Sequence, residues 1–318
     1  MELFFGIDVG KFILDIHVNP LNQIFSVNND QTGIKKLLKK INNYTKSEHC
    51  TKLIVCEATG GYENLLVDLL RDQNIPIHVA HANKVRNFAK ATGKFAKTDK
   101  IDANILSDYA MVFKPKPNAY VIDKELKALK DLQIRRRHLM DDLIKEQNRL
   151  DKNIDKELAK SINRHIKWLK QEIKLVDRKI DAFILEHKDI KAQIDLITSI
   201  PGVGQITASA ILTNLPEIKS VDNKQLSALI GVAPMNKDSG TKSGKRRIIG
   251  GRANVRNSLY MAAVASIRSN HMISKFYKRL RDKGKPAKVA IVAAMHKLLF
   301  IIKSVLKRQT VWIEYHEF

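Results

Sequence analysis

Short apolar runs and amphipathic stretches alternate through the first 110 residues, which predicts an α/β domain. The runs are rich in β-branched and aromatic residues, as strands are, and Gly10-Lys11 separates the first two in the manner of a hairpin turn. Thr32 is placed to cap a helix whose apolar residues recur every three or four positions. The predicted strands cover residues 3–9, 12–18, 23–27, 52–56 and 76–80, and the predicted helices cover residues 32–41 and the stretch after Gly60-Gly61.

The middle of the chain, from about residue 124 to residue 195, contains no Gly or Pro and predicts long helices. Its apolar residues alternate spacings of three and four, which is a heptad repeat. The repeat comprises Ile166, Leu169, Ile173, Val176, Ile180 and Phe183, and a weaker one precedes it. Such a repeat is equally typical of a helical hairpin within one chain and of a coiled coil that joins two chains.

The last third is helical, with glycine-rich turns. Its run Ile200-Pro201-Gly202-Val203-Gly204 lies between two apolar helices and resembles a helix-hairpin-helix element. In such an element the glycines let backbone N–H groups approach a phosphate at the start of the second helix. Gly202 and Gly204 are therefore candidate nucleic-acid-binding residues, and the alternative is an ordinary turn between helices.

Together these patterns predict a chain that is α/β in its first part and all-α in the rest. Three early strands followed by alternating helices and strands is the order of a ribonuclease-H-like fold. We expect three domains, over residues 1–115, 116–195 and 196–318.

The charge of the chain is uneven. Lys and Arg total 56 and Asp and Glu total 33, so the net charge is +23. The surplus is +2 over residues 1–110, +6 over 111–195 and +15 over 196–318, and no carboxylate lies between Asp238 and Asp282. A surplus of this size indicates a polyanionic partner, most often a nucleic acid. Its position suggests that the two ends of the chain have different roles.

Several classes of protein are not expected. The N-terminus has no basic leader and carries Asp8 inside its apolar run, unlike a signal peptide. The apolar stretch over residues 289–306 is broken by His296, Lys297 and Lys303, so we expect no membrane span. Two cysteines cannot by themselves form a disulfide framework or a zinc site, and we expect a reducing cytoplasm.

Four acids of the first domain are candidate metal ligands. Asp8 lies in the middle of an apolar strand, Glu57 ends another, and Asp99 and Asp102 share one face of a predicted helix. Each alone is typical of a surface or strand-edge acid. Taken together they predict an all-oxygen site, which suits Mg²⁺ or Mn²⁺, and two such ions can assist phosphodiester displacement.

A polar, basic, glycine-rich stretch follows residue 234. Ser239 precedes a glycine there, which would let its hydroxyl approach a large substrate, but Ser243 lies close by and composition does not choose between them. Six cations near these serines are candidates for neutralising a phosphate. They are Lys242, Lys245, Arg246, Arg247, Arg252 and Arg256.

The ordered set of these motifs resembles the insertion-sequence-110 family transposases, DEDD-type recombinases guided by a bridge RNA. The resemblance covers nearly the whole chain. It is carried by GIDVGK at 6–11, CEATGGY at 56–62, KTDKIDA at 97–103, IPGVG at 200–204, LIGVAP at 229–234, DSG at 238–240 and GKRRIIGGRANVR at 244–256.

The resemblance implies a RuvC-like metal-dependent catalytic domain, a coiled-coil segment and a helical transposase domain. Asp8, Glu57, Asp99 and Asp102 take the metal-binding positions of the family, and Ser239 takes the position of its catalytic serine. The implied activity is excision and insertion of a mobile element through a covalent phosphoserine intermediate. The implied partners are donor and target DNA, a structured noncoding guide RNA, and further copies of the chain in a dimer or tetramer, because the active site combines two protomers.

Two other functions remain open at this stage. A RuvC-like nuclease or junction resolvase would use activated water and form no covalent intermediate. A non-catalytic nucleic-acid-binding protein would have no use for the four acids, because carboxylates repel phosphate unless a metal lies between them.

Overall fold

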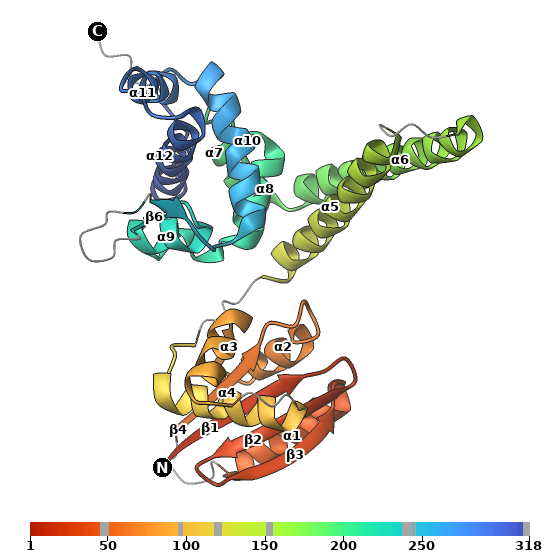
Figure 1. The fold of residues 1–318 in the computed structure, drawn as a ribbon, viewed down its shortest axis with the longest axis vertical. Coiled ribbons are helices and arrows are strands. Elements are labelled where there is room, and N and C mark those ends of the chain that lie inside the picture. The colour runs from red at the N-terminus through yellow and green to blue at the C-terminus, as the bar shows by residue number, and fades with distance from the viewer. Residues whose placement is uncertain are drawn as a thin grey trace. The chain divides into compact units, whose positions relative to one another are not determined.

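The computed structural model describes residues 1–44, 51–94, 98–117, 123–150, 155–236, 244 and 246–313. The chain forms two compact units, Met1–Val121 and Ile122–Phe318 (Figure 1). The first is a mixed α/β unit and the second is almost entirely helical, as the sequence predicts. The long helices of the middle segment belong to the second unit.

The first unit is built on a five-stranded mixed sheet with strand order β3-β2-β1-β4-β5. The three N-terminal strands are antiparallel, and β4 and β5 continue the sheet in parallel with β1. The strands are β1 (Glu2–Val9), β2 (Ile13–Asn19), β3 (Gln23–Asn28), β4 (Thr51–Glu57) and β5 (Ile77–Ala80). All five strands predicted from the sequence are present, each within about one residue of its predicted ends.

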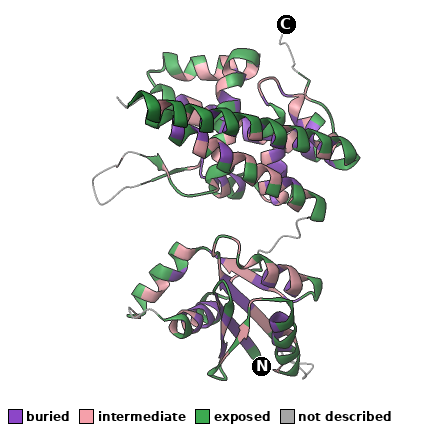
Figure 2. Cartoon of the chain, turned by 90° about the vertical axis from the view of Figure 1, so that its right-hand side faces the viewer, coloured by how far each residue is buried: buried purple, intermediate pink, exposed green. Residues whose placement is uncertain are grey.

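Helices cover both faces of this sheet. They are α1 (Gln31–Tyr44), α2 (Asn64–Asp72), α3 (Ala82–Ala91) and α4 (Asp99–Phe113). Leu3, Phe5 and Ile7 of β1 pack with α1 and α2, whereas Phe4 lies in a second core with α3 and α4. Because side chains alternate along a strand, Gly6 and Asp8 belong to the same face as Phe4. Figure 2 shows the strands as the buried centre of this unit.

Gly6 explains how closely α4 approaches the sheet. A Cβ atom at this position would lie 2.2 Å from the backbone oxygen of Ala103 and from the backbone nitrogen of Ser107. Only glycine therefore allows α4 to cross β1 at this distance. The close crossing places the first turn of α4 near the end of β1, where Asp8 lies.

One predicted helix cap is wrong. The sequence pattern assigns Thr32 as the cap of the first helix, but α1 begins at Gln31. The side chain of Asp30 accepts a hydrogen bond of 2.7 Å from the backbone N–H of Gly33. Asp30 is therefore the capping residue, and its stronger acceptor is available two residues before Thr32.

In the second unit, α5 (Lys124–Leu150) and α6 (Lys156–Glu186) lie along each other (Figure 1). The predicted repeat on α6 is buried from Ile166 to Ile180, and its last member is Ile184 rather than the half-buried Phe183. The described contacts are those of a helical hairpin within one chain. A coiled coil between chains stays a prediction.

The remaining elements of this unit surround one apolar core. They are α7 (Lys188–Thr198), α8 (Gln205–Asn214), the 3-10 helix η1 (Pro216–Lys219), α9 (Asn223–Ile230), β6 (Pro234–Met235), β7 (Arg247–Ile248), α10 (Ala253–Ser269), α11 (His271–Asp282) and α12 (Ala287–Arg308). Among the described helices, α12 is the one whose length and apolar composition would suffice to cross a membrane. Its Leu298, Leu299 and Ile302 are fully buried in the core, as in the central helix of a helical domain.

Candidate functional site

The structure brings the four predicted acids to one cavity of about 500 Å³ in the first unit. Asp8 lies near the end of β1, and Glu57 is the last residue of β4. The residues just before them, Ile7 and Cys56, are partners in the parallel pairing of β1 with β4, so the two acids lie at the same edge of the sheet. Asp99 and Asp102 form the first turn of α4, which Thr98 caps by accepting from Ile101 N–H at 3.3 Å. Three elements distant in sequence therefore converge at this cavity, and the role of the four acids as metal ligands stays a prediction.

Negative charge accumulates around Asp8. Burial, together with the carboxylates of Asp102, Asp99, Asp15 and Glu57, raises the pKa of Asp8 from 3.8 to about 6. Asp15 is the residue opposite Asp8 in the pairing of β1 with β2, and it accepts a 2.5 Å hydrogen bond from Ser26. A carboxyl group held beside several others releases its proton less readily unless a cation compensates the charge.

The donor set suits a hard divalent cation. All four acids supply oxygen, the ligand that Mg²⁺ and Mn²⁺ prefer. In the described parts of the chain, no three His, Cys, Asp or Glu side chains already lie in metal-binding positions. A cation bound between these carboxylates would offset their mutual repulsion.

Glu63 fixes the loop after β4 through three hydrogen bonds. One carboxylate oxygen of Glu63 accepts hydrogen bonds from Thr59 N–H at 3.2 Å, the Thr59 hydroxyl at 2.8 Å and Gly61 N–H at 2.8 Å. Thr59 lines the acid cavity. Burial raises the pKa of the neighbouring Cys56 thiol to about 12, so this cysteine is a core residue and not a nucleophile.

Three cations also line the acid cavity, and our sequence analysis missed them. They are Arg86 and Lys90 of α3 and Lys94 just after it. Their spacing of four residues puts them on one side of a helix and its continuation, and this spacing could have identified them. The cavity thus combines four acids with three cations, a composition that suits a phosphate group and its counter-ions.

A second cavity, of about 670 Å³, lies in the second unit between α5, α8 and α10. The predicted nucleic-acid-binding residues Gly202 and Gly204 line it, together with Arg137 of α5 and Asn254 of α10. The helix–turn–helix arrangement predicted around the glycines is present, because α7 ends at Thr198 and α8 begins at Gln205. Arg136 also lines the cavity, but its Nε donates to Asp177 at 2.6 Å.

The structure requires glycine at only one of these two positions of the turn. Gly202 has a φ of +89°, and a Cβ there would lie 2.4 Å from the backbone nitrogen of Ser266. Gly204 is the N-cap of α8 with a φ of −88°, and a Cβ there meets nothing within 4 Å. Packing therefore requires glycine at 202 and leaves open space at 204.

We predict opposite outcomes for Gly202→Ala and Gly204→Ala. The first should destabilise the second unit by about 3 kcal/mol, because it combines left-handed backbone with a clash against α10. The second should leave the free energy of unfolding nearly unchanged and, if the turn binds phosphate, weaken binding of a DNA duplex. Denaturant unfolding and a binding titration measure both effects. Equal destabilisation by the two variants would contradict this explanation of the turn.

Two predicted phosphate-binding arginines contribute to the internal structure. Arg252 donates to the backbone oxygen of Asn214 at 2.7 Å and pairs with the buried carboxylate of Glu217 at 2.5 Å. Arg256 donates to the backbone oxygens of Ile230 at 3.0 Å and Gly250 at 2.5 Å. These contacts join the segments before and after the basic stretch of residues 235–247, which we call the basic loop. A role in nucleic-acid binding stays a prediction for both residues.

Other predicted residues lie beyond what the structure describes. Ser239, its competitor Ser243, and the cations Lys242 and Lys245 are outside the described residues. Arg246 and Arg247 are exposed, and Arg247 pairs with Met235 in the short β6–β7 ladder. The described ends of the basic loop are thus held together by this ladder.

Comparison with known proteins identifies the family. Residues 5–158 match a family profile described as "Transposase", of the DEDD type, and residues 194–278 match one described as "Transposase IS116/IS110/IS902 family". The chain is 29% identical over 313 residues to the pilin gene-inverting protein of Moraxella bovis, which covers 96% of both chains. The protein of that name from Moraxella lacunata is equally similar.

A further relative comes from an insertion element. The uncharacterized 42 kDa protein of insertion element IS900, from Mycobacterium paratuberculosis, is 29% identical over 159 residues, or 45% of this chain and 38% of that protein. The two family profiles match parts of both units, and the acid cavity lies within the first profile. The chain therefore belongs to the IS110 family of transposases and is a DNA-recombining enzyme.

Proposed function

We propose that the chain excises and inserts a mobile element by cutting and rejoining DNA at the acid cavity, with Ser239 as the nucleophile. Asp8, Glu57, Asp99 and Asp102 would hold Mg²⁺, or Mn²⁺, and a bridge RNA would select the DNA. The observation that carries the proposal is the convergence of these four acids on one cavity in a DNA recombinase.

The chemistry conserves the energy of the cut bond. The serine oxygen would attack the phosphorus of one strand, and one bridging oxygen would leave as a hydroxyl. The new serine–phosphate ester has nearly the free energy of the phosphodiester it replaces, so attack by another DNA hydroxyl rejoins a strand without ATP. A bound divalent cation would neutralise charge on the phosphate and favour ionisation of the attacking hydroxyl.

The serine needs the acid cavity because nothing near it in sequence activates it. A free hydroxyl is a weak nucleophile, and residues 229–256 contain no histidine to act as a base. The acids and Ser239 lie in different units of the chain. This separation is compatible with a composite site in which one protomer supplies the acids and another the serine, and such a site makes an oligomer necessary.

The basic surplus of residues 196–318 supports a role in holding nucleic acid. Base pairing to an RNA would supply sequence specificity, while the protein would recognise mainly the backbone. We therefore expect both DNA and RNA to bind this chain. The α5–α6 hairpin exposes Leu158, Trp168 and Leu175 on α6, and these apolar side chains are available for contact with another copy of the chain.

The proposal is tested by looking for a covalent protein–DNA adduct. Full-length protein is incubated with Mg²⁺, a plasmid that carries the gene with the DNA on both sides of it, and RNA transcribed from that plasmid. We expect an adduct that survives a denaturing gel, and we expect EDTA or removal of the RNA to prevent it. Free cut ends without an adduct would instead indicate a RuvC-like nuclease that uses activated water.

A further inference from the structure

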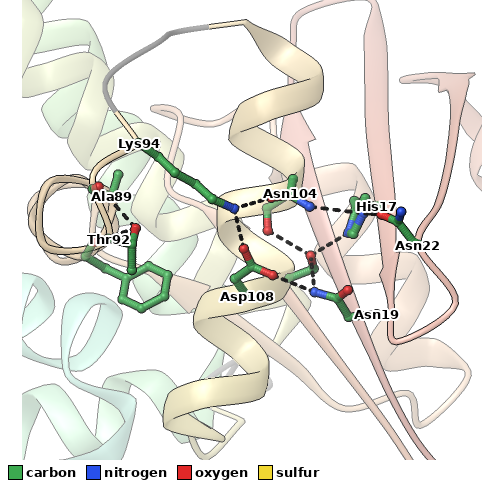
Figure 3. A network of polar contacts seen from close by, with 10 residues as sticks. His17, Asn19, Asn22, Ala89, Thr92, Lys94, Asn104 and Asp108 are labelled. Carbon is green, nitrogen blue, oxygen red and sulfur yellow. Dashed lines mark hydrogen bonds and ion pairs between the residues drawn. The ribbon is translucent and has the colours of Figure 1, made fainter.

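A polar network holds the ammonium group of Lys94, a residue that lines the acid cavity (Figure 3). The ammonium group of Lys94 donates to Asn104 Oδ1 at 2.5 Å and to Asp108 Oδ2 at 2.5 Å. Both partners belong to α4, the helix that carries Asp99 and Asp102 in its first turn. The position of Lys94 is therefore set by the element that also sets two of the acids.

Each partner of Lys94 is held in turn by a residue of β2. His17 is fully buried, and its Nε2 atom lies 3.1 Å from the side-chain amide nitrogen of Asn104. Asn19 donates to the other carboxylate oxygen of Asp108 at 2.7 Å. Buried Ser107 completes the network, lying 2.6 Å from His17 Nδ1 and 3.1 Å from Asn19 Nδ2. A network with this many mutual partners restricts side-chain movement.

Lys94 lies at the wall of the acid cavity. It is one of the residues that line this cavity, and its side chain is 37% exposed. An ammonium group has three donors, and the contacts to Asn104 and Asp108 use two of them. A free lysine side chain has about 2 kcal/mol of rotamer entropy to lose when a ligand fixes it. In this protein the hydrogen bonds to Asn104 and Asp108 already fix the side chain of Lys94 before a ligand binds.

We propose that Lys94 is a catalytic residue that binds a non-bridging oxygen of the DNA phosphodiester in the acid cavity. This inference rests on the proposed function, because it assumes that DNA is cut there. Lys94 would offset the repulsion between phosphate and carboxylates and stabilise the charge that develops during displacement. His17, Asn19, Asn104 and Asp108 are positioning residues that act through Lys94.

The inference is tested with Lys94→Gln in the full-length protein, with the plasmid, its transcript and Mg²⁺. The readout is the rate of DNA strand cutting, counting adducts and free ends together. We expect a loss of about 100-fold, the effect of removing one preorganised group from a transition state. Lys84→Gln is the matched control, because Lys84 lies on α3, the helix just before Lys94, but does not line the cavity, and this variant should cut at the wild-type rate.

Mn²⁺ affinity, measured by thermal shift without DNA, separates substrate binding from a structural role. Removing a cation from the wall of an acid cavity should leave Mn²⁺ binding equal or tighter, because one source of repulsion is gone. Weaker Mn²⁺ binding by Lys94→Gln would show that Lys94 acts by placing the acids, and this would overturn the proposal. Unchanged cutting by Lys94→Gln would also overturn it.

A double variant tests whether the network acts through Lys94. Asp108→Asn should slow cutting, and Asp108→Asn combined with Lys94→Gln should be no slower than Lys94→Gln alone. Additive losses would contradict the positioning role. If Lys94→Gln does not fold, Lys94→Met provides the same test, because it keeps the length of the side chain and removes the charge, and wild-type cutting by this variant would overturn the proposal.

The result also distinguishes this inference from the proposed function. Wild-type cutting by Lys94→Gln beside an inactive Asp8→Asn would remove the inference alone. A wild-type protein that cuts no DNA, or an Asp8→Asn variant that still cuts, would remove both.

Discussion

Asp8→Asn is expected to reduce DNA cutting and adduct formation by about 1,000-fold, equivalent to about 4 kcal/mol of transition-state stabilisation. Asp8 lies in the acid cavity, where four other carboxylates contribute to the rise in its pKa. Replacing it with a neutral amide removes one ligand and one negative charge from the proposed ion site. The same variant should therefore lose most of the thermal stabilisation that Mg²⁺ or Mn²⁺ gives to the wild-type protein.

Without metal the variant should be the more stable protein. The pKa of Asp8 is about 6 in the folded chain and 3.8 when unperturbed, so the folded state binds the proton more tightly. Between about pH 4 and pH 6 the wild-type protein therefore loses stability as the pH rises, and the asparagine variant does not show this loss. Allowing for solvent screening, we expect a gain of about 1 kcal/mol for the variant at neutral pH.

Thermal unfolding in EDTA at two pH values measures this effect. At pH 7 we expect the first unit to melt about 4 °C higher in the Asp8→Asn protein than in the wild-type protein. At about pH 4 this difference should be largely lost. Asp72→Asn is the control, because Asp72 is exposed at the end of α2 and does not line the cavity. A variant that is less stable than wild type in EDTA would contradict this prediction. It would mean that the Asp8 carboxylate stabilises the fold and that its ionisation does not cost stability.

Ser239→Ala is expected to abolish the covalent adduct, with a loss of cutting and rejoining on the order of 10,000-fold or more. The physical reason is that a methyl group cannot form the phosphate ester on which the proposed reaction depends. Binding of DNA and RNA should persist, because the basic residues of the chain are unchanged. Retained binding distinguishes loss of the nucleophile from loss of the fold.

Ser243→Ala is the matched control for this prediction. Ser243 lies four residues after Ser239 in the same basic, glycine-rich stretch of the sequence, and the family resemblance, rather than composition, chooses Ser239 over it. We expect Ser243→Ala to form the adduct at a rate close to that of wild type. An adduct that persists in Ser239→Ala and disappears in Ser243→Ala would reassign the nucleophile.

Much of the first unit could be predicted because each strand carries a strong local pattern. The alternation of β1 also places Asp8 on the face opposite Phe5 and Ile7, and the position of Glu57 at the end of β4 gives the second acid. The meeting of these acids with Asp99 and Asp102 depends on the crossing of α4 over Gly6. That contact joins residues about 100 positions apart, so no local pattern contains it.

The parts that could not be predicted depend on long-range polar contacts. Lys94 and Asp108 each look like ordinary surface residues in the sequence, and their partners on β2 are His17 and Asn19. The pairing of Arg252 with buried Glu217 is another example, since composition alone placed Arg252 among the phosphate-binding residues. The heptad repeat on α6 predicted a buried seam correctly but could not distinguish a partner helix in the same chain from one in another.

The most direct test of the account is to identify the residue joined to DNA. The Mg²⁺-dependent adduct is digested with protease and nuclease, and the peptide that retains a nucleotide is identified by mass spectrometry. We predict a nucleotide phosphate on Ser239 in the wild-type protein and no such peptide in Asp8→Asn. A nucleotide on another residue, or cut DNA with no modified peptide, would contradict the account.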